Sequence, residues 1–365
     1  MATERGLDLL DEVSKGDDEG GALKDLTAGP MVSSKGRSPF QDAWREFRRN
    51  RIAVIGMTFI GLVTLIAIFA PFLTPYSFAT QNTSYTRQKP LTPYIITTED
   101  LPDCHWAGTP LQPLCTFYVT GSDALGRDLF SRTIYGTRVS MSVAIVAATV
   151  SIVIGSVYGT VSGYASSRVD NLMMRLVDFL YAIPLLPIII LMQVYFQAIS
   201  RRGIGSEPSL MNSVLELNKL SGGLLFLFIA IGALNWIGMA RLARGQVLSY
   251  KEKEFVEAAR AVGASDTRII FKHLVPNILG PLLISESLAL PSYIFLEAVL
   301  SFIGLGVSPP IPSWGSMINE GYQGLRSNPH LVLVPGIALT VLTLAFNFMG
   351  DGLRDAFDPR MRGRH

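Results

Sequence analysis

Residues 139–167 read VSMSVAIVAATVSIVIGSVYGTVSGYASS, a run of 29 residues without a charged side chain. A helix that crosses the hydrocarbon core of a membrane needs about 20 apolar residues. The run therefore predicts a transmembrane helix over residues 139–164. An uncharged stretch of this length exceeds what the buried helix of a soluble domain requires.

Five further stretches have the length and composition of a membrane span: residues 52–72, 179–200, 220–240, 277–304 and 331–350. The composition of the whole chain agrees, because 49% of the 365 residues are hydrophobic and only 16% are charged, against about 25% charged in soluble proteins. This excludes an ordinary soluble enzyme, a coiled coil and a disordered protein. We predict an all-α, polytopic membrane protein with six transmembrane helices.

The spans divide the chain into segments. Residues 1–37 are polar and acidic and lack the apolar core of a secretory signal, so we expect a disordered cytoplasmic tail there. The further segments are residues 38–72 with the first span, an extracytoplasmic loop at 73–138, the transmembrane domain at 139–350 and a cytoplasmic C-terminus at 351–365.

The distribution of basic residues predicts the orientation. Lysine and arginine concentrate on the cytoplasmic side of membrane proteins. Six basic residues lie within residues 35–51, immediately before the first span. With that end cytoplasmic, 22 of the 31 basic residues fall in cytoplasmic segments and 9 outside. Both termini are then cytoplasmic.

One cytoplasmic segment differs from a simple connector. Residues 251–276 read KEKEFVEAARAVGASDTRIIFKHLVP. Propensity favours a helix over residues 254–262, and Gly263 suits the position of positive φ that follows a helix. Ser265 can cap a second helix that runs to about Val275. We expect Pro276 to mark the point where the chain turns into the fifth span.

The spacing of this loop resembles the signature loop of binding-protein-dependent ABC importer permeases. In that pattern Glu-Ala-Ala is followed after three residues by Gly, and after nine more by Ile-x-Leu-Pro. The corresponding residues here are Glu257, Ala258, Ala259, Gly263 and Pro276, with His273 in place of Ile and Val275 in place of Leu. The resemblance implies that the loop couples the membrane domain to an ATPase, with Ala264 and Ser265 also taking part. The alternative is an ordinary helical linker.

Other segments resemble one branch of this family, the second permease subunit of dipeptide and oligopeptide importers. They are GSDALGRDLFSR at 121–132, LSFIGLG at 300–306, PPIPSWG at 309–315 and GDGLRDAFDPR at 350–360. The resemblance implies the type I ABC importer permease fold and residence in the cell membrane of a prokaryote. It also implies three kinds of partner: a second permease, two ATPase subunits or domains, and an external substrate-binding protein.

No catalytic residue is expected in this chain. Leu220-Ser221-Gly222-Gly223 copies the start of the ABC ATPase signature, but it opens an apolar span and the sequence has no Gly-x4-Gly-Lys-Ser/Thr phosphate loop. We therefore expect ATP and Mg²⁺ to bind to the partner ATPases and no cofactor to bind here. The net charge of +2 gives no reason to expect a nucleic-acid partner; membrane lipid is an expected one.

Two carboxylates, Glu286 and Glu297, lie within the fifth span. Ionisable residues in a membrane usually face a cavity or a partner, so a place on the transport path is one interpretation. The other, favoured for Glu297, is that the carboxylate orders the turn at residues 300–306. Asp170, Arg175 and Asp178 surround the cytoplasmic loop between the second and third spans, where we expect them to pair locally or to face the ATPase.

The only two cysteines, Cys104 and Cys115, lie together in the predicted extracytoplasmic loop. Thiols outside the cytoplasm meet an oxidant, so we predict a disulfide between them. Two free thiols, or a metal bound with His105, are the alternatives. No established metal-ligand spacing occurs elsewhere in the sequence, and we expect no metal site.

Two other functions fit a polytopic protein. An ion-coupled secondary transporter or a channel could use six spans and intramembrane carboxylates, but it has no use for the 251–276 loop. A membrane scaffold or receptor would carry a soluble signalling domain, which the cytoplasmic segments lack. The substrate stays open: peptides are the main cargo of the family, and related systems move nickel, glutathione or oligosaccharides.

Overall fold

The computed structural model describes residues 39–92, 104–106, 109–110, 115, 117–202 and 210–357. The chain forms two units, Met1–Asp42 and Ala43–His365, and the description below concerns the second, apart from the first residues of one helix. The predicted tail at residues 1–37 and the last part of the predicted C-terminus lie outside the described residues.

Helices dominate the described residues, which form no β-strand and only one isolated bridge, between Ser122 and Asp128. In chain order they are α3 (Pro39–Arg49), α4 (Arg51–Ile68), α5 (Ala70–Leu73), η2 (Thr83–Tyr85), α6 (Leu129–Tyr164), α7 (Ser167–Ala182), α8 (Leu185–Arg202), α9 (Leu210–Leu220), α10 (Leu224–Tyr250), α11 (Glu254–Ala261), α12 (Asp266–Arg268), η5 (Ile269–Leu274), α13 (Val275–Phe302), α14 (Trp314–Tyr322) and α15 (His330–Phe357). The all-α prediction is confirmed.

Within the described residues, five helices are long and apolar enough to cross a membrane: α4, α6, α10, the continuous helix Asp266–Phe302, and α15. A sixth span results if α7 and α8 count as one broken span. Several helices run beyond the predicted spans. For example, α6 begins at Leu129, where Asp128 caps it by accepting hydrogen bonds from the backbone N–H groups of Phe130 and Ser131.

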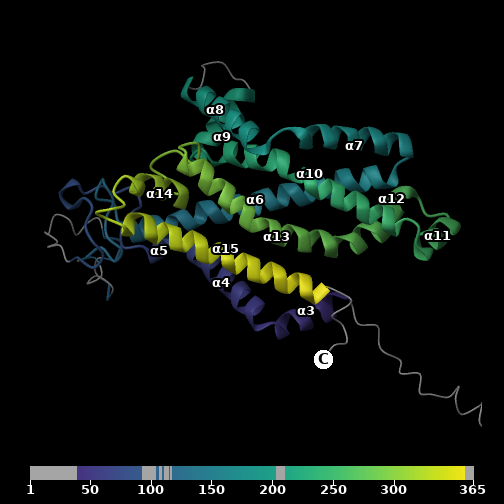
Figure 1. The fold of residues 1–365 in the computed structure, drawn as a ribbon, viewed down its shortest axis with the longest axis horizontal. Coiled ribbons are helices and arrows are strands. Elements are labelled where there is room, and N and C mark those ends of the chain that lie inside the picture. The colour runs from purple at the N-terminus through teal and green to yellow at the C-terminus, as the bar shows by residue number, and fades with distance from the viewer. Residues whose placement is uncertain are drawn as a thin grey trace, which may run out of the picture. The chain divides into compact units, whose positions relative to one another are not determined.

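The predicted third span, residues 179–200, is wrong as a single straight helix. The chain bends by 80° between α7 and α8, and Figure 1 shows the two helices pointing in different directions. Ile183 at the break has an extended backbone, with φ −78° and ψ 128°. Pro184 follows it, and a proline disfavours the helical conformation of the preceding residue.

The long helices α6 and α10 pack along each other (Figure 1). Gly155, Gly159 and Gly163 recur every four residues on α6 and face α10. A Cβ atom at Gly159 would lie 2.2 Å from the carbonyl oxygen of Ala240. Small residues at this spacing let two helix backbones approach closely within a membrane, so this stripe sets the distance between the two helices.

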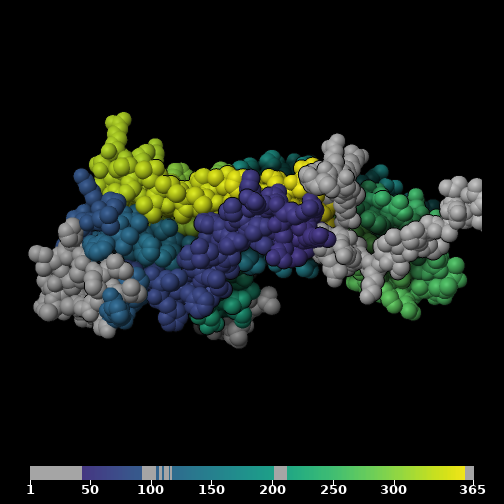
Figure 2. All heavy atoms as spheres, turned by 90° about the horizontal axis from the view of Figure 1, so that it is seen from below, coloured from purple at the N-terminus to yellow at the C-terminus, as the bar shows by residue number. Residues whose placement is uncertain are grey.

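Around these helices, α13 packs against α6, α10 and α15, and α4 packs against α15. Figure 2 shows the purple segment with α4 lying along the yellow segment with α15. Large apolar side chains remain exposed on several helices, including Leu172 and Phe179 of α7 and Leu191 of α8. Exposed apolar surface of this kind suits helices that contact lipid or another subunit.

The described part of the 73–138 loop has a small core of its own. Cys104 and Cys115 form a disulfide with a Cα–Cα distance of 6.3 Å. The buried rings of Tyr76 and Tyr118 pack around it, and the Tyr76 hydroxyl donates a hydrogen bond to the carbonyl oxygen of Cys115 at 2.6 Å. The disulfide thus stands at the centre of a packed cluster.

The glycine stripe makes a testable prediction. Gly159→Ala should destabilise the protein by about 1–3 kcal/mol, the usual effect of overpacking, because the added methyl group meets the backbone of α10. Gly238→Ala on α10 is the matched control, since nothing lies within 4 Å of its Cβ position and alanine favours the helix. Thermal unfolding of the detergent-extracted protein measures both; equal melting temperatures for the two variants would contradict the proposed packing role.

Candidate functional site

The predicted loop at 251–276 forms a short exposed helix between two spans. The helix α11 follows α10 after three residues and lies at the end of the long helices (Figure 1). It is anchored by Val256 and Ala259, which are buried in one hydrophobic cluster that also contains Val247 of α10 and Ile278 of α13. Glu257 and Ala258 are exposed, and Val262 is 85% exposed. One face of α11 therefore packs against the rest of the chain, and the opposite face is exposed.

The two alanines of the Glu-Ala-Ala sequence have different environments. Small side chains at both positions would be expected to let the helix lie in a groove of a partner. Ala259 does not do so, because it is 8% exposed and packs within this chain. Val256 and Ala259 are three residues apart and so share the inner face of the helix. Ala264 is half-buried in the same cluster.

Gly263 and Ser265 adopt the conformations predicted for them. Gly263 has φ +79°, and the N–H group of Ala264 donates to the carbonyl oxygen of Ala259 at 3.0 Å, a bond that closes the end of the helix. Ser265 precedes the next helix, and its Oγ accepts from the N–H group of Arg268 at 3.4 Å. These two residues reverse the chain within a few positions.

The predicted turn at Pro276 is wrong, because the helix continues through it. Residues Asp266–Phe302 form one long helix in which Ile269–Leu274 has π-helical hydrogen bonding. Pro276 falls in the first turn of α13, where a missing N–H is tolerated. The side chain of Asn277 donates to the carbonyl oxygen of His273 at 2.6 Å. The exposed loop is therefore joined to the fifth span by continuous helix.

Two contacts connect this loop to the end of α6. The hydroxyl of Tyr164 donates to Asp266 Oδ1 at 2.6 Å, and Lys251 Nζ donates to the carbonyl oxygen of Gly163 at 3.1 Å. The guanidinium of Arg260 lies 5.6 Å from the centre of the Tyr164 ring. A displacement of α11 would consequently act on α6 as well as on α10 and α13.

Two of the three charges at the loop between the second and third spans, Asp170 and Asp178, form ion pairs, whereas no ion pair of Arg175 occurs among the described residues. Arg244 of α10 donates to Asp170 of α7 through Nε at 2.7 Å and Nη2 at 2.6 Å. Ser162 Oγ of α6 donates to the same carboxylate at 2.6 Å. Arg241 forms an ion pair with Asp178 at 2.7 Å. These contacts fix the start and the end of α7 to the α6–α10 pair.

The two carboxylates of the fifth span are buried and face α6. Glu286 accepts from Ser151 Oγ at 3.0 Å and from the Tyr293 hydroxyl at 2.8 Å. Glu297 accepts from Ser301 Oγ at 2.6 Å and from Ser140 Oγ at 3.2 Å. Within the described residues neither has an ion-pair partner. The bond to Ser301 favours the structural role of Glu297 at the following turn.

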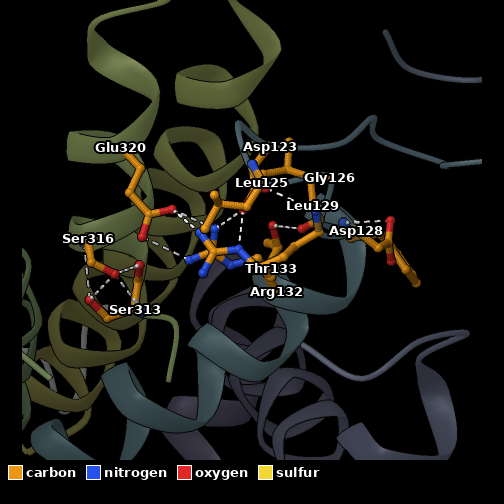
Figure 3. A network of polar contacts seen from close by, with 12 residues as sticks. Asp123, Leu125, Gly126, Asp128, Leu129, Arg132, Thr133, Ser313, Ser316 and Glu320 are labelled. Atoms are coloured by element: carbon orange, nitrogen blue, oxygen red, sulfur yellow. Dashed lines mark hydrogen bonds and ion pairs between the residues drawn. The ribbon is translucent and has the colours of Figure 1, made fainter. Parts of the chain in front are cut away.

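At the opposite end, a network of charges fixes the GSDALGRDLFSR segment to α14 (Figure 3). Arg132 contacts both Asp123 and Glu320, with Nη1 2.6 Å from Glu320 Oε2. Arg127 also contacts both, at 2.6 Å and 2.7 Å. Arg127, Arg132 and Asp123 are buried, while the Glu320 side chain is 39% exposed. Sequence reasoning missed Glu320, because it lies 188 residues from Arg132 and no local pattern marks it.

Burial changes the ionisation of one acid in this segment. It raises the pKa of Asp128 to about 6, although hydrogen bonds from Ser131 and Phe130 favour the charged form. The backbone hydrogen bonds come from its position as the cap of α6.

The remaining candidates do not form a catalytic or metal site in the described part of the chain. Residues 221–223 of the Leu-Ser-Gly-Gly sequence form the turn between α9 and α10, with positive φ at Gly222 and Gly223. Among the described residues no group of three or more His, Cys, Asp or Glu side chains could hold a metal. Glu286 and Glu297, the disulfide and the 251–276 loop are separate features rather than one site.

Membrane-spanning helices with an exposed helix between the fourth and fifth spans define a membrane permease. The family described as "Binding-protein-dependent transport system inner membrane component" matches residues 151–363, more than half of the chain. The chain belongs to this family and is an inner-membrane component. Residues 38–90 match the "N-terminal TM domain of oligopeptide transport permease C".

Curated relatives agree over nearly the whole length. The oligopeptide transport system permease protein OppC of Bacillus subtilis (strain 168) is 37% identical, covering 91% of this chain and 93% of the relative. OppC of Escherichia coli (strain K12) is 37% identical, covering 90% of this chain and 93% of the relative. The dipeptide transport system permease protein DppC of B. subtilis is 36% identical, covering 88% of this chain and 86% of the relative. An inward-facing structure of the MetNI methionine ABC transporter superposes with a TM-score of 0.46 and 19% identity, covering 62% of this chain and 97% of that chain.

The charge network yields a prediction. Arg132→Leu should destabilise the protein by about 3 kcal/mol, because it leaves the buried Asp123 with one cation fewer. Glu320→Gln should cost only about 1 kcal/mol, since Glu320 is partly exposed and solvent weakens its contacts. Thermal unfolding of the extracted protein tests both variants.

Arg138→Leu is the control for this experiment. Arg138 is an exposed arginine on the same helix, so its replacement should change stability little. If Arg138→Leu and Arg132→Leu lowered the melting temperature equally, the network would have no special role in holding α14.

Proposed function

We propose that this chain is the membrane-spanning permease subunit of an ATP-driven importer that translocates di- and oligopeptides delivered by an external binding protein. Its membership of the binding-protein-dependent family supports the transport role. The names of its relatives, oligopeptide and dipeptide transport system permeases, support the choice of cargo.

The coupling role is supported by the way α11 packs on the spans and is joined to them. On its inner face, Val256 and Ala259 belong to one buried hydrophobic cluster with Val247 and Ile278 of two spans, and its outer face presents Glu257, Ala258 and Val262. The helix is covalently continuous with α10 and with the Asp266–Phe302 helix. A partner that moves α11 therefore moves both spans.

The mechanism is alternating access. ATP binding closes the partner ATPases, and the exposed helix moves with them. The two permeases open outward, receive the peptide from the binding protein and return inward after hydrolysis. The chain does not need to bind its cargo tightly; it needs a different affinity for the cargo in the two states.

The proposed function implies particular partners and cofactors. The complex contains a second, non-identical permease and two ATPase subunits or domains, which bind ATP and Mg²⁺. The excess of lysine and arginine before α4 supports a cytoplasmic N-terminus and, with six spans, a cytoplasmic C-terminus. A Cys104–Cys115 disulfide on the opposite side agrees with this orientation.

An ion-coupled carrier is the rival function. Such a carrier would use intramembrane carboxylates as proton or ion sites. Here Glu286 and Glu297 already accept hydrogen bonds from serine and tyrosine hydroxyls. An exposed helix such as α11 has no role in that mechanism.

Gly263→Val should uncouple transport from ATP hydrolysis. A β-branched residue is strained at the φ of +79° observed for Gly263, and the strain would tilt α11 relative to its partner. We expect peptide uptake per ATP hydrolysed to fall roughly tenfold, the factor that corresponds to about 1.4 kcal/mol. Proteoliposomes containing the complex, the binding protein and labelled peptide give both rates.

Gly263→Asn separates backbone strain from side-chain size. Nothing lies within 4 Å of a Cβ atom at this position, and asparagine tolerates positive φ. Gly263→Asn should therefore stay coupled. Normal coupling in Gly263→Val membranes would remove the assigned role of the loop.

The assembly itself is a second prediction. Native mass spectrometry of the detergent-extracted complex should detect this chain with a different permease and two ATPase subunits or domains. A cysteine at Ala264 should crosslink to an ATPase. A cysteine at Leu333, exposed near the start of α15, should not.

Two other outcomes carry different meanings. A transport-competent assembly made of this chain alone would refute the importer function. A complex with two copies of this chain and no other permease would remove only the claim of a non-identical partner.

A further inference from the structure

A polar cavity lies beside the broken span. It has a volume of about 160 Å³, is partly open, and is lined by α8, α9, the start of α10 and the loop at residues 304–309. We call it the amide cavity, because its polar lining includes Gln193, Gln197, Ser200 and Asn218. None of the described residues that line it carries a charge.

The three polar residues from α8 share one face of that helix. Gln193, Gln197 and Ser200 are spaced i, i+4 and i+7, which places them on one stripe. Exposure rises along the stripe: Gln193 is 2% exposed, Gln197 is half-buried and Ser200 is exposed. The cavity therefore runs from the protein interior to the surface. Lipid contact does not explain such a stripe, since polar groups are disfavoured there.

Gln193 carries an unused hydrogen-bond acceptor. Its Oε1 atom is buried and has no hydrogen-bond partner. Buried polar atoms are nearly always paired, so an unpaired one calls for an explanation. An amide oxygen accepts hydrogen bonds and cannot donate them. A group that pairs with this atom must therefore present an N–H or O–H group.

Asn218 is held in place on the other side of the cavity. Its Oδ1 accepts from the backbone N–H group of Phe226 at 3.1 Å, and the residue is 4% exposed. The Phe226 ring stacks on Phe196 with a centroid distance of 4.5 Å. The cavity wall is thus fixed by contacts of its own and does not need a ligand to form.

The size of the cavity exceeds the need of one bound water. A water molecule occupies about 30 Å³ in the liquid, so a volume of about 160 Å³ corresponds to roughly five waters. Uncharged amide side chains provide the same donor and acceptor groups as a peptide bond. They recognise a backbone whatever side chains it carries, which suits a carrier of many different peptides.

We propose that the amide cavity binds the backbone of the transported peptide, with a peptide N–H group donating to Gln193 Oε1. The site lies on this chain and selects for the peptide group itself rather than for charge or side-chain size. The inference rests on the proposed function. The alternative occupant is water alone, in a cavity of purely structural importance.

The test uses the intact complex in proteoliposomes with its binding protein. The probes are labelled tri-alanine and two ester analogues, each with one peptide N–H group replaced by oxygen. The affinity of the binding protein for each probe is measured separately, and kcat/KM is obtained with loaded binding protein. Gln193→Met removes the acceptor at similar side-chain length, and Gln193→Glu retains an acceptor. Val194→Met, at an exposed neighbouring position, is the matched control.

Gln193→Met should lower kcat/KM for tri-alanine roughly tenfold, the effect of one hydrogen bond to a buried neutral acceptor. One of the two esters should show the same loss in the unsubstituted complex and little further loss in Gln193→Met. Gln193→Glu should keep more of the tri-alanine activity than Gln193→Met, and Val194→Met should match the unsubstituted complex. If Gln193→Met does not assemble, the unsubstituted complex still tests the proposal, because one ester should lose kcat/KM roughly tenfold against tri-alanine and the other should not.

Other results overturn the proposal. An equal loss for all three probes, or no loss for any, would identify a hydrated structural cavity only. A complex that takes up no tri-alanine even without substitution would instead refute the proposed function, and with it this site. The two failures are therefore distinguishable.

Discussion

The close approach of α6 to α10 is the constraint on which the rest of the structure depends. Helices in lipid gain little from hydrophobic burial against each other, so packing and hydrogen bonds must hold them together. Gly155, Gly159 and Gly163 allow the α6 backbone to reach the backbone of α10, where a methyl group at Gly159 would lie 2.2 Å from a carbonyl oxygen. Of the other spans, α13 packs against both helices of this pair, and α15 packs in turn on α13 and α4.

Polar groups add specific connections to that packing. Serines of α6 donate to Glu286 and Glu297 of α13, and Ser162 donates to Asp170 of α7. A carboxylate buried among apolar side chains is costly unless hydrogen bonds satisfy it. Each contact therefore selects one register of its helix against α6, because a shifted helix would leave the carboxylate without its donors.

The two ends of the bundle are held differently. At one end Arg127 and Arg132 join the start of α6 to Glu320 of α14. At the other end α11 is held by Val256 and Ala259 and by the contacts of Tyr164 and Lys251, and its outer face is free. This asymmetry suits the proposed function: a partner can act at the free face while the opposite end stays fixed.

The polar stripe of α8 belongs to the helix that breaks away at Pro184. Broken spans often accompany binding sites in transporters, because the interruption frees backbone groups and turns side chains toward a cavity. The 80° bend separates α8 from the direction of α7 and brings Gln193 beside Asn218 and the 304–309 loop. The amide cavity is thus a consequence of the break.

The sequence by itself determined the membrane class, the position of most spans and the exposed loop, since these follow from long uncharged runs and from the spacing of Glu257, Gly263 and Pro276. Residue preferences at helix ends also predicted the cap at Ser265 and the turn at Gly263. The tertiary structure decided what depends on distant partners. Glu320 meets Arg132 across 188 residues, and Ala259 turns inward rather than toward a partner. The helix passes Pro276, whose missing N–H falls in the first turn of α13, where it is tolerated. A hydropathy profile averages over many residues and therefore does not reveal the 80° bend between α7 and α8. Ion pairs between distant residues and the burial of single side chains arise only when the helices pack together.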